Sequence, residues 1–244
     1  MSDILLLDWA IMAISLFNTI MLTWLGLTVV FNADRRDWGV WIATAGLLLG
    51  ALFFVSHSAI VGLGLTQLTW RNMIFWWTAG LVPAIILPFA WYIIILWYAG
   101  YWNVPRSQLR QRQNIWLRLT TGMLIVGLVA LFTGVLLLAI PSPQLNPLRV
   151  FIRYSIAGIP FLAVGYSVYV LLCIGLSLDA LRQPAISRRV MGTVARRRAQ
   201  PWLSSASLAL MVVSLLVTGV MLWIVQDARQ RTFLEIYLDA QLTI

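Results

Sequence analysis

Long apolar runs alternate with short polar connections along the whole chain. Six runs reach the length of about 20 residues that a helix needs to cross a bilayer. The predicted spans are Trp9–Phe31, Trp38–Leu63, Asn72–Ala99, Trp116–Ile140, Phe151–Leu181 and Trp202–Val225. Each is expected to be helical, because lipid offers the backbone no hydrogen-bond partner and a barrel strand would alternate over about ten residues. The pattern predicts an all-α integral membrane protein, a bundle of six transmembrane helices.

The connections between the runs are too short to fold as soluble domains. We therefore expect residues 1–225 to form one polytopic helical bundle. Residues 226–244 are rich in Phe, Leu, Ile and Tyr. They are predicted to form an amphipathic tail on the membrane surface, or to lead into a seventh span beyond the chain end.

Composition supports lipid as the main solvent. Apolar residues make up 61% of the chain and charged residues only 10%, too few to cover a soluble domain of this length. The 13 tryptophans fit the same interpretation, because indole favours the boundary between water and lipid. The single cysteine, Cys173, excludes a disulfide within the chain.

The net charge of +9 comes from arginine alone, since the chain has no lysine. The arginines lie in the connections, which indicates membrane orientation and lipid contact rather than nucleic-acid binding. Twelve of the 17 lie in or beside the first, third and fifth connections: Arg35, Arg36, Arg106, Arg110, Arg112, Arg118, Arg182, Arg188, Arg189, Arg196, Arg197 and Arg198. This bias predicts that these connections are cytoplasmic and that the N-terminus is outside a bacterial cytoplasmic (inner) membrane.

Residues for catalysis are scarce. None of the eight acidic residues falls near the middle of a predicted span. Asp179, at the end of the fifth span, is expected to pair with Arg182 one turn away. We predict no catalytic constellation and no metal site in this chain.

The only histidine, His57, lies inside the second span between Ser56 and Ser58, and these three are the polar candidates for an intramembrane sensing role. At helical spacing it shares a stripe with Gly46, Gly50 and Gly64, predicted helix-packing positions, so it is expected to face the bundle. Three interpretations stay open. In order of preference, they are a hydrogen bond to another span, a sensing or proton-responsive role, and an axial ligand to haem or chlorophyll. No cofactor is expected under the first two.

Two further features invite interpretation. Pro83 and Pro88 in the third span and Pro160 in the fifth are hinge candidates, because proline removes a backbone donor and kinks a helix. The fifth connection carries a basic cluster, expected to be cytoplasmic, that includes Arg182, Arg188, Arg189, Arg196, Arg197 and Arg198. It is interpreted as a topology signal that also contacts anionic headgroups.

Three segments resemble the membrane-embedded N-terminal region of bacterial sensor histidine kinases with seven helices. They are WLGLTVVFNADRRDWGVWIATAGLLLGALFFVSHSAIVG, NPLRVFIRYSIAGIPFLAVGYSVYVLLCIGLSLDALR and SRRVMGTVARRRAQPW. The resemblance implies a bundle that senses a signal and passes a helix movement to a cytoplasmic phosphotransfer domain. The chain itself has neither a phospho-accepting histidine box nor an ATP-binding motif, so kinase activity would require a cytoplasmic domain that follows it.

Two functions remain open at this point. The first is a non-catalytic sensor bundle of a two-component histidine kinase type protein, with a homodimer as the expected assembly. The second is a non-catalytic accessory or scaffold subunit of a multisubunit respiratory or photosynthetic membrane complex. In that case Gly-lined helix faces would dock other membrane subunits.

Overall fold

A computed structural model shows six helices long and apolar enough to cross a membrane, and the predicted six-helix membrane bundle is confirmed. The structure describes residues 5–33, 38–67, 70–102, 107–139, 155–156, 159–182, 184, 194, 197–220 and 223. The helices are α1 (Leu5–Phe31), α2 (Trp38–Gln67), α3 (Trp70–Ala99), α4 (Gln108–Ala139), α6 (Phe161–Arg182) and a C-terminal helix, Arg197–Val220. The predicted tail, residues 226–244, lies outside the described residues.

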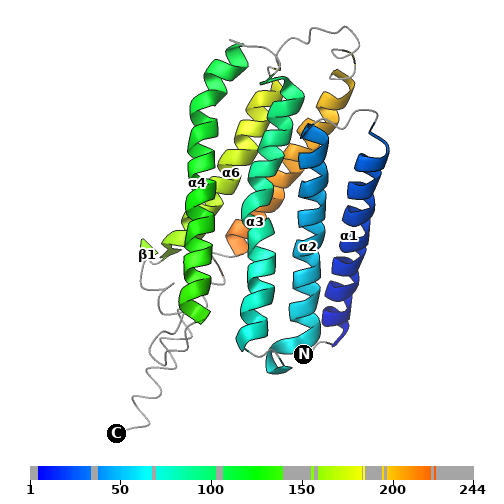
Figure 1. Cartoon of the computed structure of the whole chain (residues 1–244), viewed down its shortest axis with the longest axis vertical. Coiled ribbons are helices and arrows are strands. Elements are labelled where there is room, and N and C mark those ends of the chain that lie inside the picture. The colour runs from blue at the N-terminus through cyan, green and yellow to red at the C-terminus, as the bar shows by residue number, and fades with distance from the viewer. Residues whose placement is uncertain are drawn as a thin grey trace.

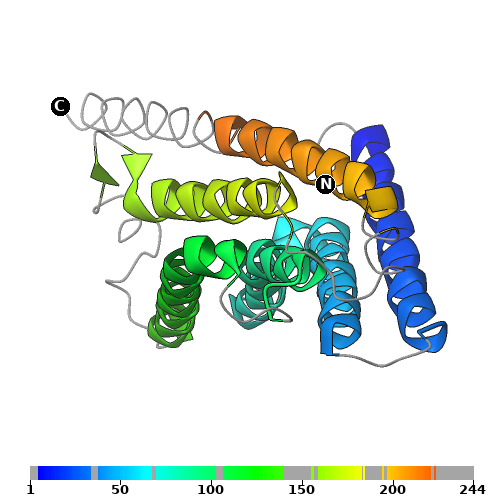
Figure 2. The same cartoon turned by 90° about the horizontal axis from the view of Figure 1, so that it is seen from above.

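The helices stand in two layers. Helices α4, α3, α2 and α1 lie side by side in chain-neighbour order, and α6 and the C-terminal helix lie behind them (Figure 1). The view from above shows α6 against α3 and α4, with the C-terminal helix forming the outer edge of the second layer (Figure 2). Helix α3 therefore occupies the centre, with α2, α4 and α6 as neighbours.

Successive helices alternate in direction. The ends of α1, α3 and α6 lie at the same end of the bundle as the beginnings of α2, α4 and the C-terminal helix, at the top of Figure 1. The first, third and fifth connections thus leave and re-enter the bundle at one end. We call this the basic end, because twelve of the 17 arginines belong to these connections and their flanks.

The fourth helix begins earlier than hydropathy predicts. Helix α4 starts at Gln108, whereas the predicted span starts at Trp116. The Ser107 side chain accepts a hydrogen bond from the backbone amide of Arg110 at 3.2 Å, so Ser107 caps the helix. Residues 108–114, polar except for Leu109, are therefore two turns of helix rather than part of a loop.

The fifth predicted span is wrong at its beginning. Helix α6 starts at Phe161, and the residues before it include two short antiparallel strands, β1 (Ser155–Ile156) and β2 (Ile159–Pro160). Pro160 therefore ends β2 and does not kink a span, contrary to the prediction. Proline disfavours helical geometry in the residue before it, which explains why Ile159 is extended and the helix begins only after Pro160.

The best-buried part of the bundle lies between α3 and α6, on the side of the basic end. Tyr92, Ile95 and Leu96 of α3 pack with Cys173 and Leu181 of α6, and all are 0–1% exposed. Leu109 of α4 completes the contact. By contrast, many large apolar side chains on α1, α4 and the C-terminal helix are exposed, as expected where lipid is the neighbour.

The end of α3 depends on one glycine. Gly100 has a φ of 86°, the left-handed region that glycine adopts without strain. The amide of Tyr101 donates to the Leu96 carbonyl at 3.0 Å and that of Gly100 to the Trp97 carbonyl at 3.1 Å. This Schellman motif turns the chain back, so that Tyr101 is 3% exposed and joins the core.

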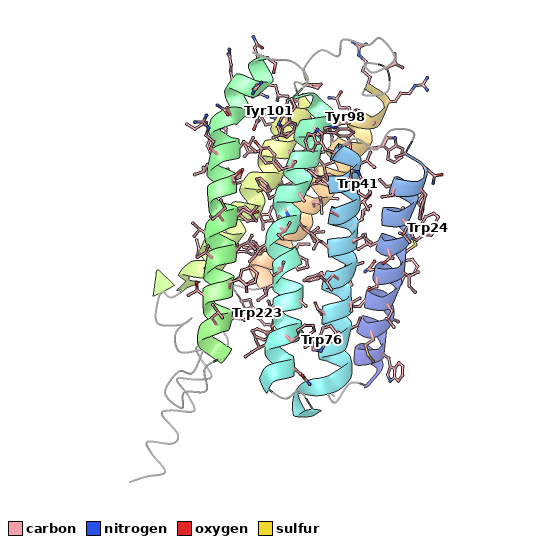
Figure 3. The ribbon with its side chains drawn as sticks, viewed as in Figure 1. Trp24, Trp41, Trp76, Tyr98, Tyr101 and Trp223 are labelled. Atoms are coloured by element: carbon pink, nitrogen blue, oxygen red, sulfur yellow. The ribbon has the colours of Figure 1, made fainter. Side chains whose placement is uncertain are left out.

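Aromatic side chains mark two levels of the bundle. Figure 3 places Trp41, Tyr98 and Tyr101 towards the basic end, and Trp76 and Trp223 towards the opposite end. Tryptophan and tyrosine favour the two membrane interfaces, so the positions fit a helix bundle that crosses one bilayer.

Candidate functional site

Four polar side chains from three helices form a connected group at the basic end, which we call the polar network. Its members are Tyr92 of α3, Arg112 and Gln113 of α4, and Asp179 of α6. The Tyr92 hydroxyl donates to Oε1 of Gln113 at 2.7 Å, and Nε2 of Gln113 donates to Oδ2 of Asp179 at 2.5 Å. Tyr92 and Gln113 are both 0% exposed. The network therefore connects the central helix to both of its neighbours on this side.

Asp179 pairs with a different arginine from the one predicted. Nε of Arg112 lies 3.0 Å from Oδ2 of Asp179, and Nη2 of Arg112 donates to the Asp179 backbone carbonyl at 3.1 Å. Arg182 is exposed at the end of α6, and the ion pair of Asp179 among the described residues is with Arg112. The predicted pairing within α6 is wrong, because the early start of α4 places Arg112 in a helix beside Asp179.

The C-terminal helix is attached to the same region. Nε2 of Gln200 donates to the Leu181 carbonyl at 2.8 Å, and Nε1 of Trp91 in α3 donates to Oγ of Ser207 at 3.2 Å. The Leu181 carbonyl belongs to the last turn of α6, where carbonyl groups lack partners within the helix. Four helices are thus joined by side-chain hydrogen bonds at or near the basic end.

His57 forms a hydrogen bond to another span. Its Nδ1 lies 3.1 Å from Oγ of Ser15 in α1, and Ser15 is 3% exposed. The arrangement agrees with the first of the three sequence interpretations. His57 as a whole is exposed, so it lies at the edge of the α1–α2 contact. Its hydrogen bond to α1 agrees with a side chain that faces a neighbouring helix, and its exposure shows that it is not enclosed by the bundle.

The side chains of the two serines beside His57 lie in different surroundings. Ser56 is 2% exposed and donates to the Phe53 carbonyl at 2.7 Å. The Ser58 hydroxyl oxygen is buried and has no hydrogen-bond partner among the described residues. Successive helical residues diverge by about 100°, so the three polar side chains form no common site.

Close helix contacts occur at other glycines than most of those predicted. Of the predicted set, Gly50 lies against Leu22 of α1, and no atom of the described residues lies within 4 Å of a Cβ added at Gly46. The surroundings of Gly64 lie outside the described residues. Helix α2 also lies close to the middle of α3 at Gly80, where an added Cβ would lie 2.6 Å from Oγ of Ser56, and the approach is closer still nearer the basic end, where Gly39 of α2 lies against the Trp97 ring of α3. Hydropathy gives no sign of these positions, because they depend on which helices become neighbours.

The remaining candidates are placed as follows. Pro83 and Pro88 lie inside α3, which continues through both. Arg182, Arg197 and Arg198 are exposed at the basic end, whereas Arg188, Arg189 and Arg196 lie outside the described residues. No group of three or more His, Cys, Asp or Glu side chains comes together in the described parts of the chain.

Sequence reasoning missed the polar network, although two signals for it exist. Ser107 stands three residues before Arg110, the position of a helix N-cap, and this would have extended the fourth span to include Arg112 and Gln113. Tyr92 is a hydroxyl-bearing ring in an apolar run, and such a group needs a partner when buried. The pairing itself joins residues 21 and 66 positions apart and could not be read from either segment alone.

Searches against family models, curated proteins and solved structures give no match to this chain.

Proposed function

We propose that this chain is the membrane-embedded sensing bundle of a two-component histidine kinase type protein, and that it is not catalytic in itself. The observation that carries the proposal is the polar network, which links α3, α4 and α6 at the basic end. A change in the packing of one of these helices is transmitted to the other two through directed hydrogen bonds, of which that between Tyr92 and Gln113 is buried and that between Gln113 and Asp179 is half-buried. Such a link suits a bundle that passes a movement to the side of the membrane where the arginines lie.

The proposal includes an orientation. We place the basic end in the cytoplasm of a bacterium and the N-terminus outside the inner membrane, because arginine is retained on the cytoplasmic side. Reporter fusions after Phe31 and after Arg182 are expected to report the cytoplasm, and a fusion after Ala139 the outside. The reverse pattern would contradict the orientation and the sensing proposal with it.

The functional test begins with the reading frame beyond Ile244. Because six spans with the N-terminus outside leave the chain outside after the sixth helix, we expect the frame to continue through a seventh span and then into a cytoplasmic region with a phospho-accepting histidine and an ATP-binding fold. A stop codon there, with no kinase encoded alongside, would refute the proposal.

If the frame continues, the full-length protein in proteoliposomes should phosphorylate itself with ATP. Replacing Gln113 by Leu should change the rate several-fold, because it removes the hydrogen bonds of Gln113 to Tyr92 and Asp179 and leaves Arg112 as the remaining link from α4 to Asp179. The exposed Gln111, two residues away, serves as the control, and Gln111→Leu should leave the rate unchanged. Equal rates for all three proteins would show that the network is structural only.

A second candidate is supported by the exposed apolar faces. Ile125, Val126 and Val129 of α4, and Leu215, Leu216 and Val217 of the C-terminal helix, are 51–68% exposed. Lipid accounts for such faces, but they also fit an accessory subunit that docks neighbours in a larger membrane complex. Purification in mild detergent separates the two: a homodimer supports the sensor, and a stoichiometric complex with other subunits supports the scaffold.

A further inference from the structure

Proline at position 88 leaves one carbonyl of α3 without its helical partner. In an α-helix each carbonyl accepts from the amide four residues later, and proline has no amide hydrogen. Pro88 therefore frees the carbonyl of Ala84, and its ring crowds the turn that contains Ile85. Inside a bilayer no water is available to satisfy such a group.

Two tyrosines of α6 donate to carbonyls of this turn, one of them to the carbonyl that Pro88 frees. The Tyr166 hydroxyl donates to the Ala84 carbonyl at 3.0 Å, and the Tyr169 hydroxyl donates to the Ile85 carbonyl at 2.9 Å. The tyrosines are three residues apart, so they lie on one face of α6 and reach two successive carbonyls of α3.

The second proline of α3 offers a contrast. Pro83 is among the fully buried side chains, and it removes the helical donor to the carbonyl of Ala79. Among the described residues, no side chain donates to that carbonyl. The tyrosine pair is thus specific to the turn at Pro88, although both prolines weaken the helix in the same way.

We propose that Pro88 is a pivot in α3 and that the hydroxyls of Tyr166 and Tyr169 hold it in the conformation seen here. A shift of α6 along α3 removes both hydroxyls from the Ala84 and Ile85 carbonyls and lets α3 bend at this turn. The pivot is a property of the bundle that goes beyond the proposed function, since it operates whether or not a kinase follows.

The proposal is tested by measuring the bend directly. Spin labels at Phe75→Cys and Ile94→Cys bracket the pivot, and 19 residues of straight helix separate them by about 28 Å. Pulsed electron paramagnetic resonance in nanodiscs should give a narrow distribution of distances between the two labels in the labelled parent protein. The variant Tyr166→Phe/Tyr169→Phe should broaden it and shift its centre by several ångströms. The protein with Cys173 alone controls for labelling of that buried thiol.

The decisive comparison uses a variant in which Pro88 is replaced by alanine. In a Pro88→Ala background the amide of residue 88 satisfies the Ala84 carbonyl, so the double Phe variant should keep the narrow distribution. A Pro83→Ala background should not restore it. An unchanged distribution in the double Phe variant, or equal recovery by both alanine substitutions, would overturn the proposal.

Thermal unfolding supplies a second measurement if the double variant folds poorly. Tyr166→Phe alone should lower the unfolding midpoint by several degrees in the parent, followed by tryptophan fluorescence. The shift should fall to less than half in the Pro88→Ala background. Equal shifts in both backgrounds would mean that the tyrosine does not act on the carbonyl freed by the proline.

Discussion

The α1–α2 hairpin and the unit formed by α3, α4 and α6 are held together by different kinds of contact. Lipid is as apolar as leucine, so helices inside a bilayer gain nothing from burying apolar surface against one another. The unit of α3, α4 and α6 is held by well-packed large side chains and by the polar network. The hairpin relies on close approach at Gly26 and Gly50 and on one hydrogen bond between Ser15 and the exposed His57.

The difference indicates which residues determine the helix packing in each part of the bundle. In the hairpin, many small contacts hold two helices that are adjacent in the chain, and no single side chain is decisive. In the unit, a few directed bonds select the neighbours of α3. Substitutions in the polar network should therefore have larger effects than substitutions in the hairpin, and the following predictions test this order.

The largest effect is expected for Gln113→Leu. Gln113 is 0% exposed and joins Tyr92 to Asp179, so leucine leaves a buried hydroxyl and a carboxylate oxygen without this partner. An unsatisfied buried group costs about 1–3 kcal/mol, and we expect a loss of about 2–3 kcal/mol in the free energy of unfolding. Reversible unfolding in SDS, followed by tryptophan fluorescence, measures it. The control Gln111→Leu, at an exposed site of the same helix turn, should change the free energy by less than about 0.5 kcal/mol.

The second-largest loss of stability is expected where α2 of the hairpin contacts α3 of the other unit. In Gly80→Ala the new methyl group would lie 2.6 Å from Oγ of Ser56, a buried side chain that must shift. Overpacking costs about 1–3 kcal/mol, offset in part by the better helix propensity of alanine, so a net loss of about 1 kcal/mol is expected. Gly46→Ala in α2 is the matched control, since nothing lies within 4 Å of its added Cβ. A loss at Gly46 as large as that at Gly80 would contradict the contact described here.

A smaller effect is expected from the ion pair. Asp179 and Arg112 lie 3.0 Å apart, but their side chains are 41% and 36% exposed, so screening limits the attraction to about 1 kcal/mol or less. A double-mutant cycle with Asp179→Asn and Arg112→Gln should show this coupling. The same cycle with Arg182→Gln should show none. Coupling of Asp179 to Arg182 and not to Arg112 would instead support the ion pair expected from the sequence.

These residues show how far sequence reasoning reaches in a membrane bundle. The six spans follow from hydropathy, because lipid imposes long apolar helices and leaves few alternatives. Hydropathy failed at the beginning of α4, because residues 108–114 are polar yet helical, and at the beginning of α6, where Ile159 and Pro160 are apolar yet extended. In both places a local rule, the Ser107 cap or the restriction before proline, decides against the hydropathy average.

Side-chain contacts between different helices could not be predicted in this way. Arg182 is three residues from Asp179 in sequence, and Arg112 is 67 residues away, yet the distant residue makes the bond. Sequence spacing could supply only the nearer partner. The polar network and the contact of the two α6 tyrosines with α3 depend on which helices become neighbours, and a single sequence contains no direct record of that.

The smallest effect is expected at the residue that stands out most in the sequence. His57→Ala removes one hydrogen bond, and interhelical hydrogen bonds in membranes contribute about 0.6 kcal/mol on average. The variant should insert normally and lose about that amount in SDS unfolding. A cycle with Ser15→Ala should assign the loss to the pair, and Ser58→Ala should not couple to it.

The same variant also separates the remaining interpretations of His57. If the imidazole were an axial ligand, the purified parent would carry a Soret or Qy absorption band that His57→Ala abolishes. A loss of more than about 2 kcal/mol without any band would instead place His57 on a par with Gln113. The contrast between the two parts of the bundle would then fail, because a single exposed contact would hold the hairpin as firmly as the buried network holds α3, α4 and α6.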